Sequence, residues 1–275
     1  MGNLWQRCGA ALSTQHPDAM IGRETAAVAH NFLWLPDQWA ATRDIRVDAP
    51  REDTTRSSRR GLDRRLCAIP PEDVWDWDGL RVASIARTAV DLARYHDRSV
   101  VVPILDSLLT QERCSREQLL ACLDRMVHVR HVRRAREMVE LARPGAASPR
   151  ETHTRLQMLD AGLPEPDVNL LIMNGAQLLA QGDLGYWRWL IWIEYDGEEY
   201  HMLRRWDGKD QRKDRWLGRR GWEVFRLTNS DYHAPAEFLS QVEVARAEAP
   251  ARIAAMDPGR SPEVAEARRL LGFDR

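Results

Sequence analysis

The sequence lacks the features that mark several common classes of protein. Its formal net charge is −1 over 275 residues, so no global charge excess steers it toward nucleic acid or membrane, and any such attraction must be local. No apolar run approaches the roughly 18 residues of a membrane span, and the amino terminus has no basic-then-apolar signal pattern. The cysteines form no C-x-x-C pair, so a zinc site and a disulfide framework are poorly supported; they are Cys8, Cys67, Cys114 and Cys122. We therefore expect a cytoplasmic protein that does not enter a membrane.

Hydrophobic residues make up 44% of the sequence, which suits one or two domains with ordinary cores. The clearest boundary is the run from Arg143 to Pro149, where two prolines and a glycine interrupt a helical pattern. We therefore divide the chain into an amino-terminal region (residues 1–143), an α/β domain (residues 144–245) and a helical carboxy-terminal tail (residues 246–275).

The amino-terminal region is predicted to be rich in α-helix. Two short helices are expected near its start, the second opening after Gly22. Joined by a tight turn, they are compatible with a winged helix-turn-helix within about residues 1–75; a small helical cap on the next segment is the alternative. From about residue 80 to 143 the pattern predicts a helical layer, with Ser84 as the N-cap of its first helix.

Two segments of this region are rich in arginine. The first, Arg51 to Arg65, is an apolar-poor loop that follows a strand predicted at Asp44 to Pro50. The second, His128 to Arg136, places a basic stripe beside an apolar one on a helix. Each segment is either a solvated surface or a phosphate-contacting one, and both interpretations stay open. With one arginine of a later polar helix, the candidate nucleic-acid contacts are Arg59, Arg60, Arg130, Arg133, Arg134 and Arg212.

The most informative stretch runs from Gly182 to Gly197 and is predicted to form a β-hairpin. Its second strand is aromatic and β-branched, and the carboxylate of Glu194 ends it. If the reversal is centred on Arg188-Trp189, antiparallel pairing places Asp183 opposite Glu194, with Cβ atoms roughly 4.5–5.5 Å apart. Acids crowded in this way either face water at a hairpin tip or share a divalent cation, the simplest partner for adjacent like charges.

Further polar candidates follow the hairpin. Asp196 closes it, His201 comes next, and Lys213 lies in a polar helical stretch. That helix is predicted to end at Gly221, and residues 222–227 alternate apolar and charged side chains as a strand does. The expected order is therefore strand, strand, helix, strand.

Another helix is predicted to begin at Ser148, ahead of the hairpin. Ser148 is the N-cap, Pro149 lies in the first turn, and Glu151 takes the third position of a capping box. A capping role therefore accounts for Glu151 from the local sequence.

In this order and spacing, the motifs closely resemble the Vsr-like endonuclease domain of the PD-(D/E)XK nuclease superfamily. The resemblance spans roughly residues 145–240 and includes Ser148 to Glu151, Asp183, Glu194 to Gly197, His201, Lys213 and Gly221 to Arg226. It implies an α/β fold, a restriction-endonuclease-like mixed sheet flanked by helices, preceded here by the α-rich region. Separately, residues 80–93 resemble a segment of AbiEi-type antitoxin-like proteins that follows an amino-terminal winged helix.

The nuclease resemblance implies hydrolysis of phosphodiester bonds at a carboxylate site that holds Mg²⁺, or Mn²⁺ in its place. Asp183 and Glu194 are the implied metal ligands, since hard oxygen donors suit these ions. Glu151 aligns with a glutamate that the first helix often presents to the metal in this superfamily. Capping and catalysis therefore both stay open for Glu151.

The resemblance departs from the superfamily pattern at Asp196, where lysine is usual. Lys209 or Lys213 is a candidate for the missing positive charge. His201 is a candidate general base, with packing as the alternative role. The expected catalytic set is Glu151, Asp183, Glu194, Asp196, His201 and Lys213, with no small-molecule cofactor.

The leading expectation is thus a metal-dependent DNA endonuclease, a hydrolase. The alternative is a catalytically inactive DNA-binding regulator of antitoxin type. A protein-binding module, suggested only by eleven tryptophans, is a third. DNA is the expected partner in the first two cases, and the sequence predicts no oligomeric state.

Overall fold

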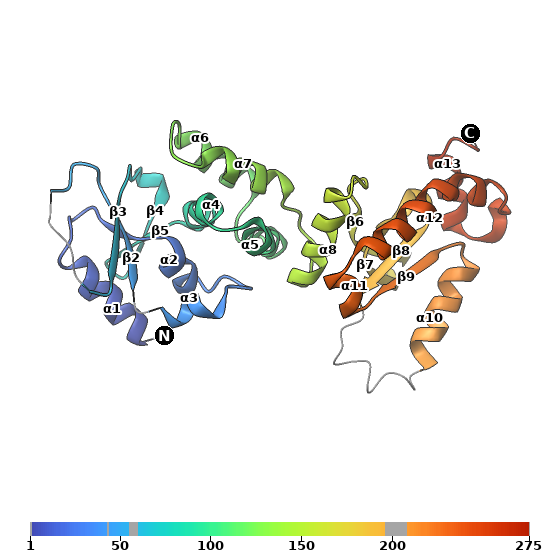
Figure 1. Ribbon diagram of the computed structural model, residues 1–275, viewed down its shortest axis with the longest axis horizontal. Coiled ribbons are helices and arrows are strands. Elements are labelled where there is room, and N and C mark those ends of the chain that lie inside the picture. Colours follow the sequence, from blue (N-terminus) through green and yellow to red (C-terminus); the bar gives the residue numbers. More distant parts are fainter. Residues whose placement is uncertain (1, 43, 55–59, 196–207, 275) are drawn as a thin grey trace. The chain divides into compact units, whose positions relative to one another are not determined.

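The chain divides into two compact units, Met1–Gly145 and Ala146–Arg275. The computed structural model describes residues 2–42, 44–54, 60–195 and 208–274 (Figure 1). The division falls within the run of proline and glycine between Arg143 and Pro149. Residues 246–275 belong to the second unit. Each unit has a mixed sheet and helices, which confirms the expected α/β class.

The first unit is built on a five-stranded sheet in the order β3-β2-β1-β5-β4. Strand β1 pairs antiparallel with β2 and parallel with β5; β2 and β3 are parallel, and β4 and β5 are antiparallel. The strands are β1 (Met20–Ile21), β2 (Ile45–Ala49), β3 (Leu62–Leu66), β4 (Val74–Trp77) and β5 (Leu80–Ala83). The strand expected at residues 44–50 is confirmed as β2. The region is therefore less purely helical than its sequence predicted.

Helices complete the first unit, and they account for most of the layer expected after residue 80. Helix α4 starts one residue after Ser84, whose side chain accepts the Arg87 N–H as an N-cap does. The helices are α1 (Gly2–Leu12), α2 (Arg23–Ala29), α3 (Asp37–Ala41), the short 3₁₀ helix η1 (Pro71–Asp73), α4 (Ile85–Tyr95), α5 (Arg98–Thr110), α6 (Arg116–Arg125) and α7 (Val132–Leu141).

The two short helices expected near the amino terminus exist as α1 and α2, but no tight turn joins them. Strand β1 lies between them, and its Met20 and Ile21 side chains are fully buried. They pack with Val47 and Val82 of the neighbouring strands. Burial of these two apolar side chains at the centre of the sheet favours a strand at a position where a tight turn was expected.

The second unit contains a four-stranded sheet in the order β6-β7-β8-β9. The strands are β6 (Asp167–Asn174), β7 (Gln177–Tyr186), β8 (Ile191–Tyr195) and β9 (Glu223–Leu227). Leu184 faces Ile193 and Tyr186 faces Ile191, so the reversal is centred on Arg188-Trp189 as predicted, at the 3₁₀ helix η2 (Trp187–Trp189). Strand β9 runs parallel to β8.

Helices pack on this second sheet, and each face has its own hydrophobic cluster. Trp192 and Leu217 belong to one cluster, while Ile193, Met158 and Phe238 belong to the other. Helix α10 packs against β9, and α12 against β8 and β9 (Figure 1). The helices are α8 (Pro149–Asp160), α10 (Gly208–Arg219), α11 (Asn229–His233), α12 (Ala236–Ala254), the 3₁₀ helix η3 (Pro258–Arg260) and α13 (Pro262–Leu270). The order strand, strand, helix, strand is thus confirmed.

Residues after 245 contribute to the core of the second unit. Ala249, Ile253, Val264 and Ala267 are buried in the cluster that contains Trp192. No helix in the described part of the chain is long and apolar enough to cross a membrane.

Candidate functional sites

The candidate carboxylate site lies where β7 and β8 stop pairing. Leu184 and Ile193 are the last backbone partners, so Asp183 and Glu194 are the next positions in the same register. Beyond that pair, a side chain replaces the backbone as the hydrogen-bond acceptor between the strands: Asp183 Oδ2 accepts the Tyr195 N–H at 2.8 Å. The two acids are neighbours, as the hairpin register predicted.

Glu194 is held by cations of the protein itself. Its Oε1 accepts the Trp192 indole N–H at 2.7 Å and a hydrogen bond from Lys213 Nζ, while Oε2 lies 3.1 Å from Arg226 Nη1. Lys213 also donates to the Gln181 carbonyl at 2.9 Å. The Glu194 side chain is only 12% exposed, so these partners neutralise a largely buried carboxylate.

Glu151 caps its own helix. The Ser148 hydroxyl accepts the Glu151 N–H at 3.3 Å and donates to Glu151 Oε1 at 2.9 Å, and Oε2 accepts the Ala147 N–H at 2.7 Å. Burial raises the pKa of the Glu151 carboxyl, the Ala147 N–H opposes that effect, and the charge of Asp183 raises the pKa further. Ser148 is thus confirmed as the N-cap, but the reciprocal bond of the predicted capping box goes to the Ala147 N–H and not to the Ser148 N–H. Glu151 also lies close enough to Asp183 for their charges to interact.

The other predicted members of this site are placed less fully. Asp196 and His201 lie outside the described residues, and so does the Lys209 side chain. Within the described ranges, no group of three histidine, cysteine or acidic side chains is arranged to hold a metal ion. The catalytic set and the Mg²⁺ or Mn²⁺ ion therefore stay predictions.

A second concentration of charge lies in the core of the first unit. Asp48 of β2 and Asp91 of α4 are fully buried, and both bind Arg65 of β3. Asp91 also accepts Arg87 Nε at 2.8 Å and Arg94 Nη1 at 2.6 Å. Buried carboxylates require such partners, since an unpaired charge in the interior is strongly destabilising.

The two buried aspartates respond differently to this environment. Burial alone would raise the pKa of Asp91, but Arg87, Arg65 and Arg94 hold it well below its usual value. Burial raises the pKa of Asp48; Arg65 opposes this, and the neighbouring charge of Asp91 adds to it. Asp91 is therefore the anion on which the arginines converge.

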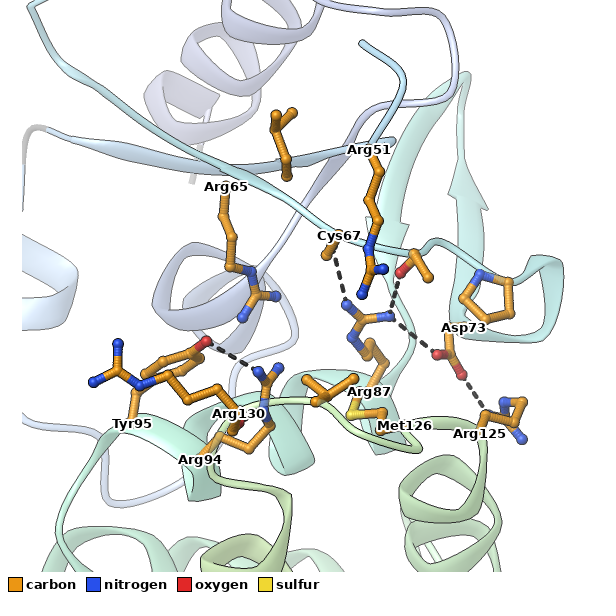
Figure 2. Close-up of a pocket in the computed structure, with 14 residues that line it drawn as sticks. Arg51, Arg65, Cys67, Asp73, Arg87, Arg94, Tyr95, Arg125, Met126 and Arg130 are labelled. Atoms are coloured by element: carbon orange, nitrogen blue, oxygen red, sulfur yellow. Dashed lines mark hydrogen bonds and ion pairs between the residues drawn. The ribbon is translucent and has the colours of Figure 1, made fainter.

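The network continues to the surface through Asp73. Its Oδ2 accepts Arg87 Nη1 at 3.1 Å, and its Oδ1 accepts Arg125 Nη2. Figure 2 shows both bonds, with the Asp73 carboxylate between the two guanidinium groups. Arg87 Nη2 also lies 3.3 Å from the Cys67 sulfur. Burial, and next the charge of Asp48, raise the pKa of the Cys67 thiol, so this cysteine is held neutral.

These side chains border a cavity of about 240 Å³, which we call the arginine pocket (Figure 2). Its lining comes from the ends of β2 and β3, from α4, and from α6 and the segment after it. The arginines that line it are Arg51, Arg65, Arg87, Arg94, Arg125 and Arg130.

Val129 and Arg130 of the basic segment from His128 to Arg136 line this pocket. Helix α7 begins only at Val132, so the helix predicted from His128 is wrong for the first four residues of the segment. Arg130 and Arg133 are exposed and have no side-chain partner among the described residues. Arg134 pairs with Asp97 at 3.1 Å, and Arg136 pairs with Asp124 at 2.6 Å.

The remaining predicted nucleic-acid contacts are scattered. Arg60 is exposed next to the gap in the described chain, and Arg59 lies within that gap. Arg212 is exposed on α10 of the second unit. The structure thus groups Arg130, Arg133 and Arg134, and it does not bring Arg212 into the same unit.

Sequence reasoning missed the buried aspartate and arginine network. One signal was present, because Arg87 and Asp91 stand four residues apart on a helix whose neighbours are apolar. Arg65, however, is predicted to lie in an arginine-rich loop, either solvated or in contact with phosphate, and this placement is wrong. It belongs to β3 and meets Asp48 and Asp91 across 17 and 26 residues of sequence, a distance that local patterns do not reveal.

Comparison with known proteins bears on this first unit. Residues 19–141 match a family model described as the AbiEi antitoxin C-terminal domain. The segment is similar to that domain. The match begins just before β1 and ends with the last residue of α7. The AbiEi-like segment therefore contains the whole five-stranded sheet and every residue that lines the arginine pocket. The AbiEi resemblance noted at residues 80–93 is confirmed. Much of the stretch expected to form a winged helix lies inside this segment.

Two curated relatives are also similar to the chain. They are uncharacterised proteins from two strains of Mycobacterium tuberculosis, each 29% identical over 153 residues, which cover 53% of this chain and 54% of the relative. The chain thus spans about half the length of the curated relatives it matches. No solved structure matches it. The Vsr-like resemblance of residues 145–240 stays a prediction.

Proposed function

We propose that this protein is a DNA-binding regulator of antitoxin type. The match of residues 19–141 to the AbiEi antitoxin C-terminal domain carries the proposal. The exposed arginines of the AbiEi-like segment support it, because clustered cations on one face supply the phosphate contacts that dominate affinity for DNA.

Arg130 and Arg133 are the principal contacts in this proposal. Arg130 lies in the turn before α7 and Arg133 in its first turn; both are exposed and lack a side-chain partner among the described residues, so binding a phosphate breaks no ion pair. Arg134 is 39% exposed and paired with Asp97, which is itself 86% exposed. Such an exposed pair is worth about 0–1 kcal/mol, so Arg134 can exchange its carboxylate for a phosphate at little cost.

A mobility-shift assay with the full chain tests this function. A duplex taken from upstream of the protein's own gene is expected to shift, and Arg133→Gln is expected to weaken binding severalfold by removing one phosphate contact. The matched control is Arg269→Gln, which removes the same charge from a side chain that is 63% exposed on α13. Equal loss in both variants, or no shift with the natural protein, would refute the proposal.

Phosphodiester hydrolysis by the second unit is a second candidate. It is favoured by the register that makes Asp183 and Glu194 neighbours and by the electrostatic proximity of Glu151 to Asp183. A divalent ion would activate water and offset phosphate charge. In the described arrangement the donors do not fit such an ion, because Lys213 and Arg226 already neutralise Glu194.

Incubation of the full chain with plasmid and single-stranded DNA in Mg²⁺ or Mn²⁺ tests this candidate. If hydrolysis occurs at this site, Glu194→Ala abolishes it. Glu223→Ala, a carboxylate on β9 that is 40% exposed, leaves it intact. Cleavage that survives Glu194→Ala would assign the activity elsewhere.

A further inference from the structure

The arginine pocket has more positive charge than its own carboxylates balance. Six arginines line it, and three aspartates, Asp48, Asp73 and Asp91, accept ion pairs from them. Arg65, Arg87, Arg94 and Arg125 make these pairs. Arg51 and Arg130 are exposed, and within the described ranges neither guanidinium has a hydrogen bond or an ion pair. Ion pairs with aspartates therefore account for the presence of four of the six arginines, but not for that of Arg51 and Arg130.

Most carboxylate oxygens near the cavity are already bound. Asp48 and Asp91 are fully buried and do not line the pocket. Asp73 does line it, but its two oxygens accept hydrogen bonds from Arg87 and Arg125. Figure 2 shows the Arg51 side chain extending toward Arg87. The cavity thus presents guanidinium N–H donors, a lining that attracts anions and repels cations.

Part of the pocket wall is apolar. Tyr95 and Leu66 are 42% and 48% exposed, and Met126 and Val129 line the same cavity. A volume of about 240 Å³ is far more than a single bound anion needs, since one water takes roughly 30 Å³. The lining therefore suits an anion that carries a ring or another apolar portion, which can lie against Tyr95.

The backbone beside the pocket is held in an unfavourable conformation. His128 and His131 have φ angles of +60° and +64°, in the left-handed region that residues with a side chain rarely adopt. Arg94 Nε donates to the Arg130 carbonyl at 2.9 Å and fixes this segment against α4. Seven other non-glycine residues of the described chain have such angles, so this conformation fixes the path of the segment and does not by itself mark a ligand site.

We propose that the arginine pocket binds a phosphate monoester that carries a nucleoside-sized ring, the chemistry of a 5′-mononucleotide. Arg51 and Arg130 bind the phosphate from the rim, and Arg87, fixed by Asp73 and Asp91, contributes positive charge beneath it. Tyr95 and Met126 contact the ring. This site shares Arg130 with the proposed DNA-binding surface, but Arg51 belongs to the pocket alone and Arg133 does not line the cavity.

Isothermal titration calorimetry of the full chain tests the proposal with AMP and GMP as the probes. Adenosine, which lacks the phosphate, and inorganic phosphate, which lacks the ring, are titrated separately. At least one mononucleotide is expected to bind, and both fragments are expected to bind at least about tenfold more weakly, since charge-assisted hydrogen bonds and ring contacts each contribute. Inorganic phosphate as tight as the mononucleotides would overturn the assignment of a ring-bearing ligand.

Substitutions test whether the mononucleotide binds in the arginine pocket. Arg51→Gln is expected to weaken mononucleotide binding about tenfold or more through loss of a charge-assisted contact. Arg136→Gln, a 40% exposed arginine of the same unit that pairs with Asp124 and does not line the pocket, is the matched control and should leave binding unchanged. Unchanged thermal unfolding of both variants shows that they fold. Binding that is lost equally in both, unaffected in both, or absent in the natural protein would overturn the proposal.

The two functions are separable in the same variants. Arg133→Gln is expected to weaken DNA binding and leave mononucleotide binding intact, whereas Arg51→Gln is expected to do the reverse. A loss of duplex affinity in Arg51→Gln as large as its loss of mononucleotide affinity would mean that the cavity takes a backbone phosphate, and the small-molecule site would be wrong.

Discussion

Asp91 shows how single residues organise the first unit. Its carboxylate is fully buried, yet it accepts hydrogen bonds from Arg65, Arg87 and Arg94 at 2.6–3.2 Å. These three arginines come from β3 and α4, and Arg65 also binds Asp48 of β2. One buried anion thus joins a helix to two strands, and removal of its charge would leave guanidinium groups buried without compensation.

Replacement of that carboxylate tests its structural role. Asp91→Asn is expected to lower the free energy of unfolding by about 3–5 kcal/mol, the usual loss when one partner of a buried ion pair is removed. Urea denaturation of the full chain measures the change. Asp97→Asn is the control, because its side chain is 86% exposed and its pair with Arg134 is worth less than about 1 kcal/mol. Similar losses in the two variants would contradict the role given to Asp91.

The titration of the Glu24 carboxyl is expected to make the stability of the first unit depend on pH. Burial alone would raise the pKa of this carboxyl, but hydrogen bonds from His96 and from its own backbone, and the charge of Arg46, lower it to about 2. Its folded pKa lies below the unfolded value, so Glu24 stabilises the fold above pH 4.5, and this contribution is lost between pH 4.5 and about 2.

The Glu24→Gln variant isolates this effect. At neutral pH the variant should be less stable than the natural protein, by at most about 3 kcal/mol. The two stabilities should converge as the pH falls from 4.5 to about 2. Denaturant titrations at several pH values measure both. Curves that stay parallel over this range would show that Glu24 does not titrate as described.

At the scale of helices and strands, the sequence predicted the features that depend on residues close together in the chain. The register that places Asp183 beside Glu194 follows from where the hairpin reverses, and the starts of α4 and α8 follow from their serine caps. Pairings between distant segments were not predictable in this way. Strand β1 has only two residues, and β3 pairs in parallel with β2, although most of its residues were expected to lie in an arginine-rich loop.

The same limit applies to the candidate sites. Sequence placed Glu194 at the end of a strand, but it did not show that Lys213 and Arg226, from the next helix and strand, bind its carboxylate. Nor did it show the arginine pocket, whose lining comes from several separate elements. Such sites exist only after the tertiary fold brings their parts together.

Substitution of Gly182 in β7 tests how tightly the β7–β8 hairpin is packed. A Cβ at Gly182 would lie 2.6 Å from the ring of Trp192, which is fully buried. Gly182→Ala is therefore expected to cost about 1–3 kcal/mol of stability by overpacking. Gly218→Ala on α10 has nothing within 4 Å and should be neutral or slightly stabilising. Thermal unfolding of the two variants compares them, and equal melting temperatures would contradict the packing.

At the scale of the whole molecule, the chain joins two α/β units that carry different candidate chemistry. The arginine pocket of the AbiEi-like segment has more arginines than the aspartates that pair with them, whereas Glu194 of the second unit is bound by Lys213 and Arg226 of its own unit. A net charge of −1 conceals this difference. The separation favours binding as the function of the first unit and leaves hydrolysis by the second as the less supported alternative.

The salt dependence of duplex binding by the full chain tests the central proposal most directly. If arginines of the AbiEi-like segment contact phosphates, the logarithm of the association constant falls linearly with the logarithm of salt concentration. Arg130→Gln and Arg133→Gln should each reduce the slope by about 0.9. A slope near zero, or one that neither substitution alters, would contradict DNA binding through this surface.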